Sequence, residues 1–164
     1  NYSAMVFVNG TNAVGTISTN SSATAYNTSS DYRLKENVNY DWDALTTLKQ
    51  LKPAKFNFKV DASTTVDGFL AHEVSSIVPE AITGTKDEMI DTGILKDSKG
   101  KVLATKTEKP GDLHITGYTF EKTGETEKYQ GIDQAKLVPL LTAALQEAVA
   151  KIEALEARVT TLEG

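Results

Sequence analysis

A serine hydroxyl and a lysine amine lie five positions apart at Ser30 and Lys35. A serine becomes a nucleophile when a base takes its proton, and lysine is a base only after losing its own. Burial in an apolar site favours the neutral amine. The pair therefore suggests a Ser/Lys catalytic dyad. This spacing alone is weak support, because serine and lysine five apart occur by chance in most proteins of this size.

The neighbouring residues could supply what such a dyad needs. Leu34 and Val38 are candidates for an apolar wall beside the lysine, and Arg33 would disfavour a second cation there. Asn37 is a candidate donor to the oxyanion that forms during acyl transfer. Ser29 is a rival nucleophile, one position farther from the lysine.

The composition changes abruptly at the same place. Residues 1–30 contain no Asp, Glu, Lys or Arg, and the charges begin at Asp31. Residues 5–8 before Asn9-Gly10 predict a strand entering a tight turn, with residues 14–19 as the returning strand. Two strands bury little, so we expect this segment to pair with copies of itself or with a preceding body; a flexible polar linker is the alternative. Because the chain begins at Asn1, we expect it to be a C-terminal fragment of a longer protein.

Residues 31–83 predict a globular core. Asp41 or Asp43 is expected to cap a helix over residues 44–51, before Pro53. Alternation over residues 55–60 predicts a half-buried strand.

The chain after this strand is expected to turn at Asp67-Gly68. Residues 69–78 then predict a short helix that ends at Pro79. Residues 84–130 are rich in Gly, Thr and charged residues, with turns at residues 97–100 and 109–112 and strand-like pieces at 102–105 and 114–120. They predict a protruding β-rich insertion, since a core of this size does not need so long a polar excursion.

Residues 135–164 form the clearest predicted element, a helix with apolar residues in a seven-residue repeat. The repeat places Val138, Leu145, Ile152 and Val159 at position a, and Leu141, Ala148, Leu155 and Leu162 at position d. Lys151 and Arg158 at g would face Glu156 and Glu163 at e of a parallel neighbour. The repeat predicts a parallel homo-oligomer without deciding between two and three strands; one amphipathic helix packed on its own domain is the alternative.

Composition excludes several other classes of function. A net charge of −5 without a basic cluster argues against a nucleic-acid or anionic-lipid surface. The sequence shows no membrane-length apolar run. The absence of cysteine excludes disulfides and thiolate chemistry, and two isolated histidines, His72 and His114, do not suggest a zinc site. We expect no metal and no cofactor.

Four segments of the chain together resemble the peptidase S74 family, the intramolecular chaperone domains that end many phage tailspikes, tail fibres and neck appendages. The first is Ser30-Asp31-x-Arg33-x-Lys35-x-Asn37, and the second is Leu48-x-x-Leu51-x-Pro53-x-x-Phe56-x-Phe58. The third runs from Gly68 through Val74 to Val78-Pro79-Glu80, with His72 where the family pattern leads us to expect Gln. The fourth is Tyr129-x-Gly131 leading to Leu137 and Glu147. The insertion at 84–130 matches no motif of the family.

The resemblance implies an α+β fold and a function. The fold would combine a small mixed core, a protruding β-rich arm at 84–130, and a C-terminal helix at 135–164 in a parallel, three-stranded coiled coil. Residues 1–29 would be the end of the client β-stalk and residues 30–164 the chaperone. The homotrimer would assist folding of the stalk in the bacterial cytoplasm and then cleave the Ser29–Ser30 bond, with Ser30 as nucleophile and Lys35 as base. The chaperone would be released, and the upstream part would remain in the virion.

Two alternatives remain open at this point. The chain could be a trimerisation or receptor-binding tip that stays attached. It could also be the related self-cleaving module of membrane-tethered eukaryotic transcription factors, which the uncharged upstream segment and the lack of a following span disfavour.

Overall fold

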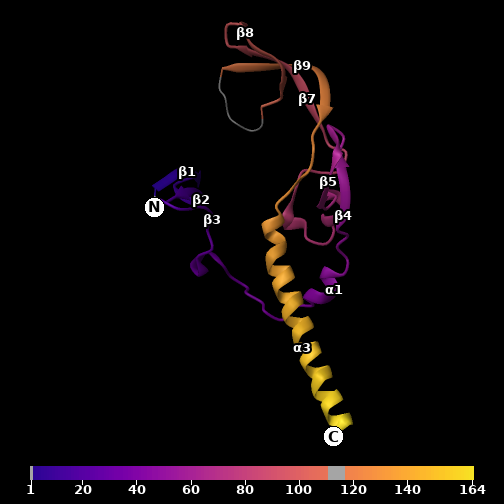
Figure 1. Ribbon diagram of the computed structural model, residues 1–164. Coiled ribbons are helices and arrows are strands. Elements are labelled where there is room, and N and C mark those ends of the chain that lie inside the picture. The colour runs from indigo at the N-terminus through magenta and orange to yellow at the C-terminus, as the bar shows by residue number, and fades with distance from the viewer. Residues whose placement is uncertain (1, 111–116) are drawn as a thin grey trace. The chain divides into compact units, whose positions relative to one another are not determined.

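The computed structural model describes residues 2–110 and 117–164, with side chains from residue 5 onward (Figure 1). Its contacts divide the chain into two compact units, Asn1–Trp42 and Asp43–Gly164. The units combine several small antiparallel sheets with one long C-terminal helix, so the predicted α+β class is confirmed. His114 and the predicted turn at residues 109–112 lie wholly or partly outside the described residues.

The first unit contains a three-stranded antiparallel sheet, β1 (Tyr2–Asn9), β2 (Asn12–Thr19) and β3 (Thr24–Thr28), in that order. The predicted hairpin is confirmed, and its turn uses Gly10 at φ 62°, a left-handed conformation that glycine adopts without strain. Strand β3 was not predicted. It follows a turn in which Asn20 Oδ1 accepts hydrogen bonds from the backbone N–H groups of Ser22 and Ala23. The apolar side chains of residues 5–8 are all exposed.

The core of the second unit forms where short helices meet the start of the long helix. Helix α1 (Ala44–Leu48) is capped by Asp43, whose carboxylate accepts the Thr46 N–H at 3.0 Å. Helix α2 (Ala71–Val74), the 3₁₀ turns η2 (Pro79–Ala81) and η3 (Gln134–Leu137), and helix α3 (Val138–Glu163) complete it. The buried side chains are Ala44, Leu51, Val74, Val78, Ala81, Leu137, Leu140 and Ala144.

A hairpin of β4 (Ala54–Phe58) and β5 (Asp61–Gly68) follows α1. The predicted strand is confirmed, but the predicted turn at Asp67-Gly68 is wrong. Both residues pair in register with β4, and Gly68 lies where the Phe56 ring would meet a side chain. Here glycine serves a close approach between strands rather than a turn.

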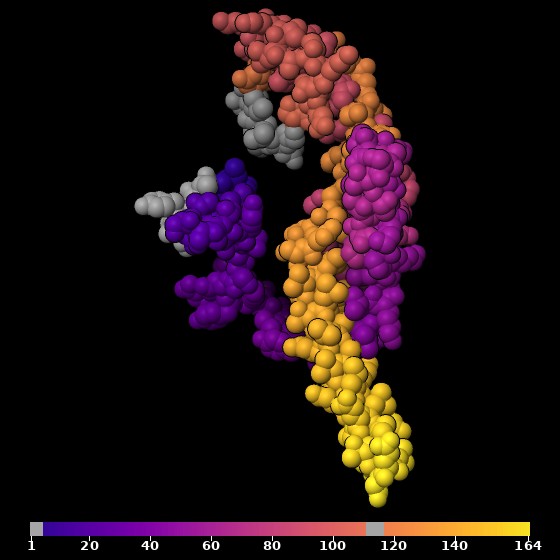
Figure 2. All heavy atoms as spheres, in the orientation of Figure 1, coloured from indigo at the N-terminus to yellow at the C-terminus, as the bar shows by residue number. Residues whose placement is uncertain are grey.

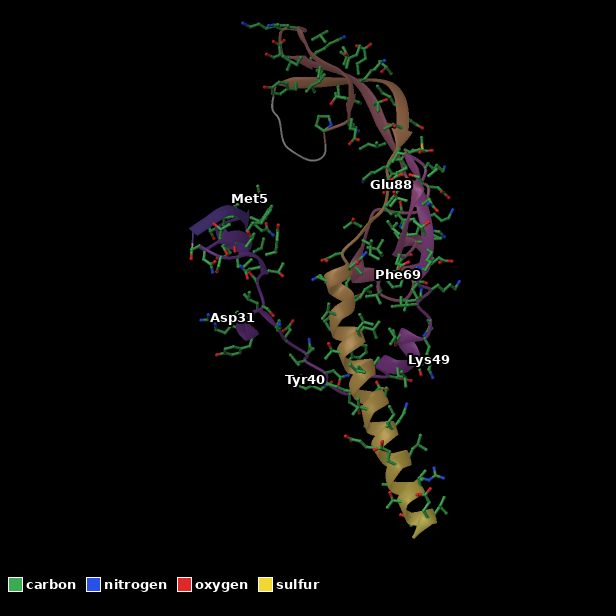
Figure 3. The ribbon with its side chains drawn as sticks, in the orientation of Figure 1. Met5, Asp31, Tyr40, Lys49, Phe69 and Glu88 are labelled. Atoms are coloured by element: carbon green, nitrogen blue, oxygen red, sulfur yellow. The ribbon has the colours of Figure 1, made fainter. Side chains whose placement is uncertain are left out.

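The insertion forms a three-stranded antiparallel sheet, which we call the arm. Its strands are β7 (Met89–Asp97), β8 (Val102–Glu108) and β9 (Tyr118–Glu127), in the order β8-β7-β9. The arm leaves the core beside the short pair β6 (Ile82–Thr83) and β10 (Gly131–Ile132). Glu88, labelled in Figure 3, joins its two connecting segments by accepting a hydrogen bond from the Lys128 amine at 2.7 Å.

Helix α3 uses different faces for different contacts. Leu140 and Ala144, at heptad positions c and g, are buried against the core. Every a and d side chain of the predicted seam except Ala148 is exposed, with Leu145 at 65% and Ile152 at 54%. Residues 149–163 of the helix are all exposed among the described residues, and Figure 2 shows the yellow C-terminal end projecting from the rest of its unit. The helix therefore packs on its own domain and still presents the heptad stripe to solvent.

Candidate active site

The segment between Ser30 and Lys35 forms one tight turn. The 3₁₀ turn η1 (Tyr32–Leu34) is capped by Asp31, labelled in Figure 3, and is held by backbone bonds from Leu34 N to Asp31 O and from Lys35 N to Tyr32 O, each 3.1 Å. Asp31 Oδ1 accepts the Arg33 N–H at 2.9 Å, as a short polar side chain does at a helix start. The turn folds the chain back between the two candidate catalytic residues.

This turn brings the Lys35 amine within hydrogen-bond distance of the Ser30 hydroxyl. Lys35 Nζ donates a hydrogen bond to Ser30 Oγ at 2.7 Å. That distance lies within the range over which a general base reaches its nucleophile. The two residues that the sequence singled out for chemistry are thus in direct contact.

Ser29 and Ser30 belong to different local structures. Ser29 is tied to the sheet, since its N–H donates to Val14 O at 3.0 Å and its hydroxyl donates to Ala13 O at 3.1 Å. The Ser30 hydroxyl instead faces Lys35. The rival nucleophile is therefore engaged elsewhere, and the peptide bond between the two serines joins the sheet to the turn.

The charges around the dyad are arranged differently from the prediction. The Arg33 guanidinium forms a two-pronged ion pair with Asp31, Nε to Oδ1 at 2.9 Å and Nη2 to Oδ2 at 2.8 Å. Hydrogen bonding from Arg33 lowers the pKa of the Asp31 carboxyl, and the carboxylate raises the pKa of the guanidinium. Arg33 is thus neutralised by its partner rather than left as a bare cation beside Lys35.

The predicted apolar wall does not form among the described residues of a single chain. Leu34 is 73% exposed and Val38 is 59% exposed. Lys35 is exposed as well. Desolvation of the lysine must therefore come from something other than the described residues of one chain.

Asn37 occupies a special backbone position. Its φ is 54°, in the left-handed region that asparagine tolerates better than most residues. We find no hydrogen bond of its side-chain amide within residues 2–110 and 117–164. The backbone conformation is by itself a sufficient reason for asparagine at this position.

Glu147 is a structural residue that the sequence alone did not assign. Its Oε1 accepts the N–H groups of Ala44 at 2.8 Å and Leu45 at 3.3 Å. The carboxylate thus holds the first turn of α1 against α3, where helix N–H groups lack partners. In the sequence, Glu147 stood out only as the last residue of the fourth segment that resembles the peptidase S74 family.

The part of the chain that the structure describes also bears on metal sites, membrane spans and apolar grooves. No cluster of His, Asp or Glu that could hold a metal ion occurs among these residues. No helix among them is long and apolar enough to cross a membrane.

An apolar groove of about 470 Å³ lies beside the start of α3, lined by Leu48, Leu51, Pro53, Phe69, Gln134, Leu137 and Leu141.

Comparison with known proteins bears on the segment that carries the dyad. A search of curated proteins finds no match. A family model described as "Peptidase_S74: Chaperone of endosialidase" matches residues 30–83. The match begins at Ser30, two residues after the end of β3, and extends through α1, β4, β5 and α2. Residues 30–83 of this chain are therefore a Peptidase S74, chaperone-of-endosialidase, domain.

Proposed function

We propose that this chain is a folding chaperone that assembles as a homotrimer and cuts itself from its client at the Ser29–Ser30 bond. The observation that carries the proposal is the 2.7 Å contact between Lys35 Nζ and Ser30 Oγ at the first residues of the matched domain. Membership of the peptidase S74 family implies an autoproteolytic serine peptidase. The assignment of Ser30 and Lys35 to the catalytic roles is our proposal.

The reaction is an acyl shift followed by hydrolysis. Neutral Lys35 takes the Ser30 hydroxyl proton as Oγ attacks the carbonyl carbon of Ser29, forming a tetrahedral oxyanion. Collapse breaks the C–N bond, and the departing Ser30 amine takes up the proton. The product is an ester between the Ser29 carbonyl and Ser30 Oγ. Water then hydrolyses this ester, leaving a Ser29 carboxylate and restoring the Ser30 hydroxyl.

Assembly would complete the site. Lys35 is exposed in one chain, and its neighbours in the sequence include the exposed apolar residues Tyr32, Leu34 and Val38. Another copy that covers these residues would remove water from the lysine and favour its neutral form. Cleavage would then follow assembly, so that a client is released only after its chains are together.

The long helix supports self-association. Leu140 and Ala144 at positions c and g pack inside the chain, whereas every a and d side chain except Ala148 is exposed. Burying such a stripe between parallel copies is the usual outcome for a heptad repeat. The family resemblance favours three strands. A helical bundle that forms first also raises the effective concentration of the client segments.

The remaining segments fit client and arm. The sheet of residues 2–28 carries no charge and has two free edge strands, β1 and β3, which is a surface prone to mispairing. We propose that it is the end of a phage fibre, spike or appendage stalk, folded in the bacterial cytoplasm. The arm at 84–130 would shield such edges during folding. The boundary between client and chaperone at residues 29 and 30 is part of this proposal.

Mass spectrometry of freshly expressed protein tests the cleavage. We expect a fragment that begins at Ser30, and both Ser30→Ala and Lys35→Ala should leave the chain intact. If the folded, assembled wild-type chain stays intact, the alternative of a permanent trimerisation or receptor-binding tip replaces the proposal.

A deletion tests the arm. Thr83 and Gly131 are paired across β6 and β10, so an Asn-Gly turn can join them in place of residues 84–130. The shortened chain should assemble as before but give less folded client when fused to its stalk. An unchanged yield of folded stalk would remove the shielding role.

A further inference from the structure

Asp31 lies between Ser30 and Lys35 in the sequence. Its side chain holds the turn that brings these two residues together. Five fully extended residues span about 17 Å, far more than a lysine side chain can bridge. The Lys35 amine reaches Ser30 Oγ because the chain folds back through η1. The Asp31 carboxylate accepts three hydrogen bonds in this turn, all from Arg33.

Apolar packing against the described residues of the chain does not hold this turn. Tyr32 is 81% exposed and Leu34 is 73% exposed. A 3₁₀ turn with two backbone hydrogen bonds is weak by itself, because its hydrogen-bond geometry is poor. Within one chain, the contacts of Asp31 with the backbone and guanidinium of Arg33 are therefore the main restraint on its shape.

We propose that Asp31 is a positioning residue for the dyad, which acts through Arg33 to hold Lys35 against Ser30 and takes no proton in the reaction. The proposal rests on the cleavage described above and assigns a role to two motif residues. The competing role is that Asp31 is itself the base. Its carboxylate is occupied by the guanidinium, whereas the lysine amine contacts the nucleophile directly.

Cleavage kinetics separate the two roles. Asp31→Ala should slow cleavage by roughly tenfold or more, because misplacement of a catalytic group is costly. Asp31→Asn should slow cleavage less than Asp31→Ala, since the asparagine amide oxygen can still accept a hydrogen bond from the Arg33 N–H. Glu36→Gln is the matched control: it removes a negative charge from the same segment, and we find no ion pair of Glu36 among the described residues.

The pH profile supplies a readout that a base would change. The rate of Asp31→Asn should still rise with pH, as in the wild-type chain, because lysine remains the titrating base. The midpoint should move to lower pH, since the unpaired Arg33 cation disfavours a charged lysine nearby. Asp31→Asn and Arg33→Gln should also be non-additive, as expected for two residues that act as one pair. A rate of Asp31→Asn that no longer depends on pH, additive effects, or wild-type cleavage by Asp31→Ala would overturn the proposal.

Amide hydrogen exchange tests the turn without relying on cleavage. In the Ser30→Ala background, Asp31→Ala should speed exchange of the Leu34 and Lys35 amides, which are bonded in the turn. Glu36→Gln should leave these two amides unchanged. Equal exchange in both variants overturns the positioning role. Faster exchange together with an uncleaved wild-type chain overturns the proposed cleavage and the catalytic part of the role, while supporting the turn.

Discussion

The Glu147 carboxylate accepts the backbone N–H of Ala44 at 2.8 Å and so fastens helix α1 to helix α3. The two residues are 103 positions apart in the sequence. Ala44 directly follows Asp43, the cap of α1 and the first residue of the second unit. The contact therefore stabilises the first helix of the core, which directly follows the segment that carries the dyad in the sequence.

Removing this carboxylate should destabilise the core. Glu147→Ala leaves two partly buried N–H groups without their acceptor, which costs about 1–3 kcal/mol. Glu147→Gln retains an acceptor oxygen and should cost less. Thermal unfolding at equal chain concentration measures the effect, with exposed Glu153→Gln as control. A melting temperature for Glu147→Ala equal to that of the control would show that the contact adds nothing.

The substitution Lys35→Arg distinguishes the positive charge of the lysine from its ability to act as a base. Lys35→Arg keeps a cation and N–H donors but cannot supply a neutral base, because arginine stays protonated at all accessible pH. We expect cleavage to fall by roughly 100-fold or more, whereas Lys49→Arg, an exposed lysine outside the site, should cleave normally. The wild-type rate should rise with pH, since only the neutral amine accepts the proton. Normal cleavage by Lys35→Arg would exclude lysine as the base.

Two substitutions at Asn37 distinguish its backbone from its amide. Glycine keeps the φ of 54° without strain and removes the amide, whereas alanine removes the amide and resists this conformation. If the backbone matters, Asn37→Gly should cleave at nearly the wild-type rate and Asn37→Ala more slowly. Equal, severe loss in both variants would instead support the oxyanion role.

The exposed heptad stripe predicts where self-association is sensitive. Ile152→Asp places a charge on the seam at position a, so analytical ultracentrifugation should show smaller species. Ala154→Asp introduces the same charge at position c of the same exposed turn and should leave the assembly intact. A monomeric wild-type chain, or equal behaviour of the two variants, would count against the seam.

The Asp31–Arg33 pair has a predictable pH dependence. Because Arg33 lowers the folded-state pKa of Asp31, the pair stabilises the turn above the ordinary carboxyl range near pH 4, and this contribution is lost as pH falls through the lowered value. An NMR titration of the carboxyl carbon should show a midpoint below the ordinary value. Arg33→Gln should raise this midpoint. An unchanged midpoint would mean that the pair does not persist in solution.

Local pattern was enough for much of this protein. Asn9-Gly10 predicted the first hairpin, Asp43 was one of the two predicted caps of α1, and the heptad repeat predicted α3, because each depends on neighbours in sequence. The contact of Ser30 with Lys35 belongs to the same class, since one short turn closes it. The cleavage and the trimer remain predictions.

Tertiary structure decided what depends on distant partners. The sequence alone suggested a turn at Asp67-Gly68, but pairing with β4 makes those residues a strand. Nothing in the local pattern showed that Glu147 would cap α1, or that α3 would bury its c and g face while leaving a and d exposed. Burial and long-range hydrogen bonds depend on where the folded chain places its surfaces, which no short segment specifies by itself.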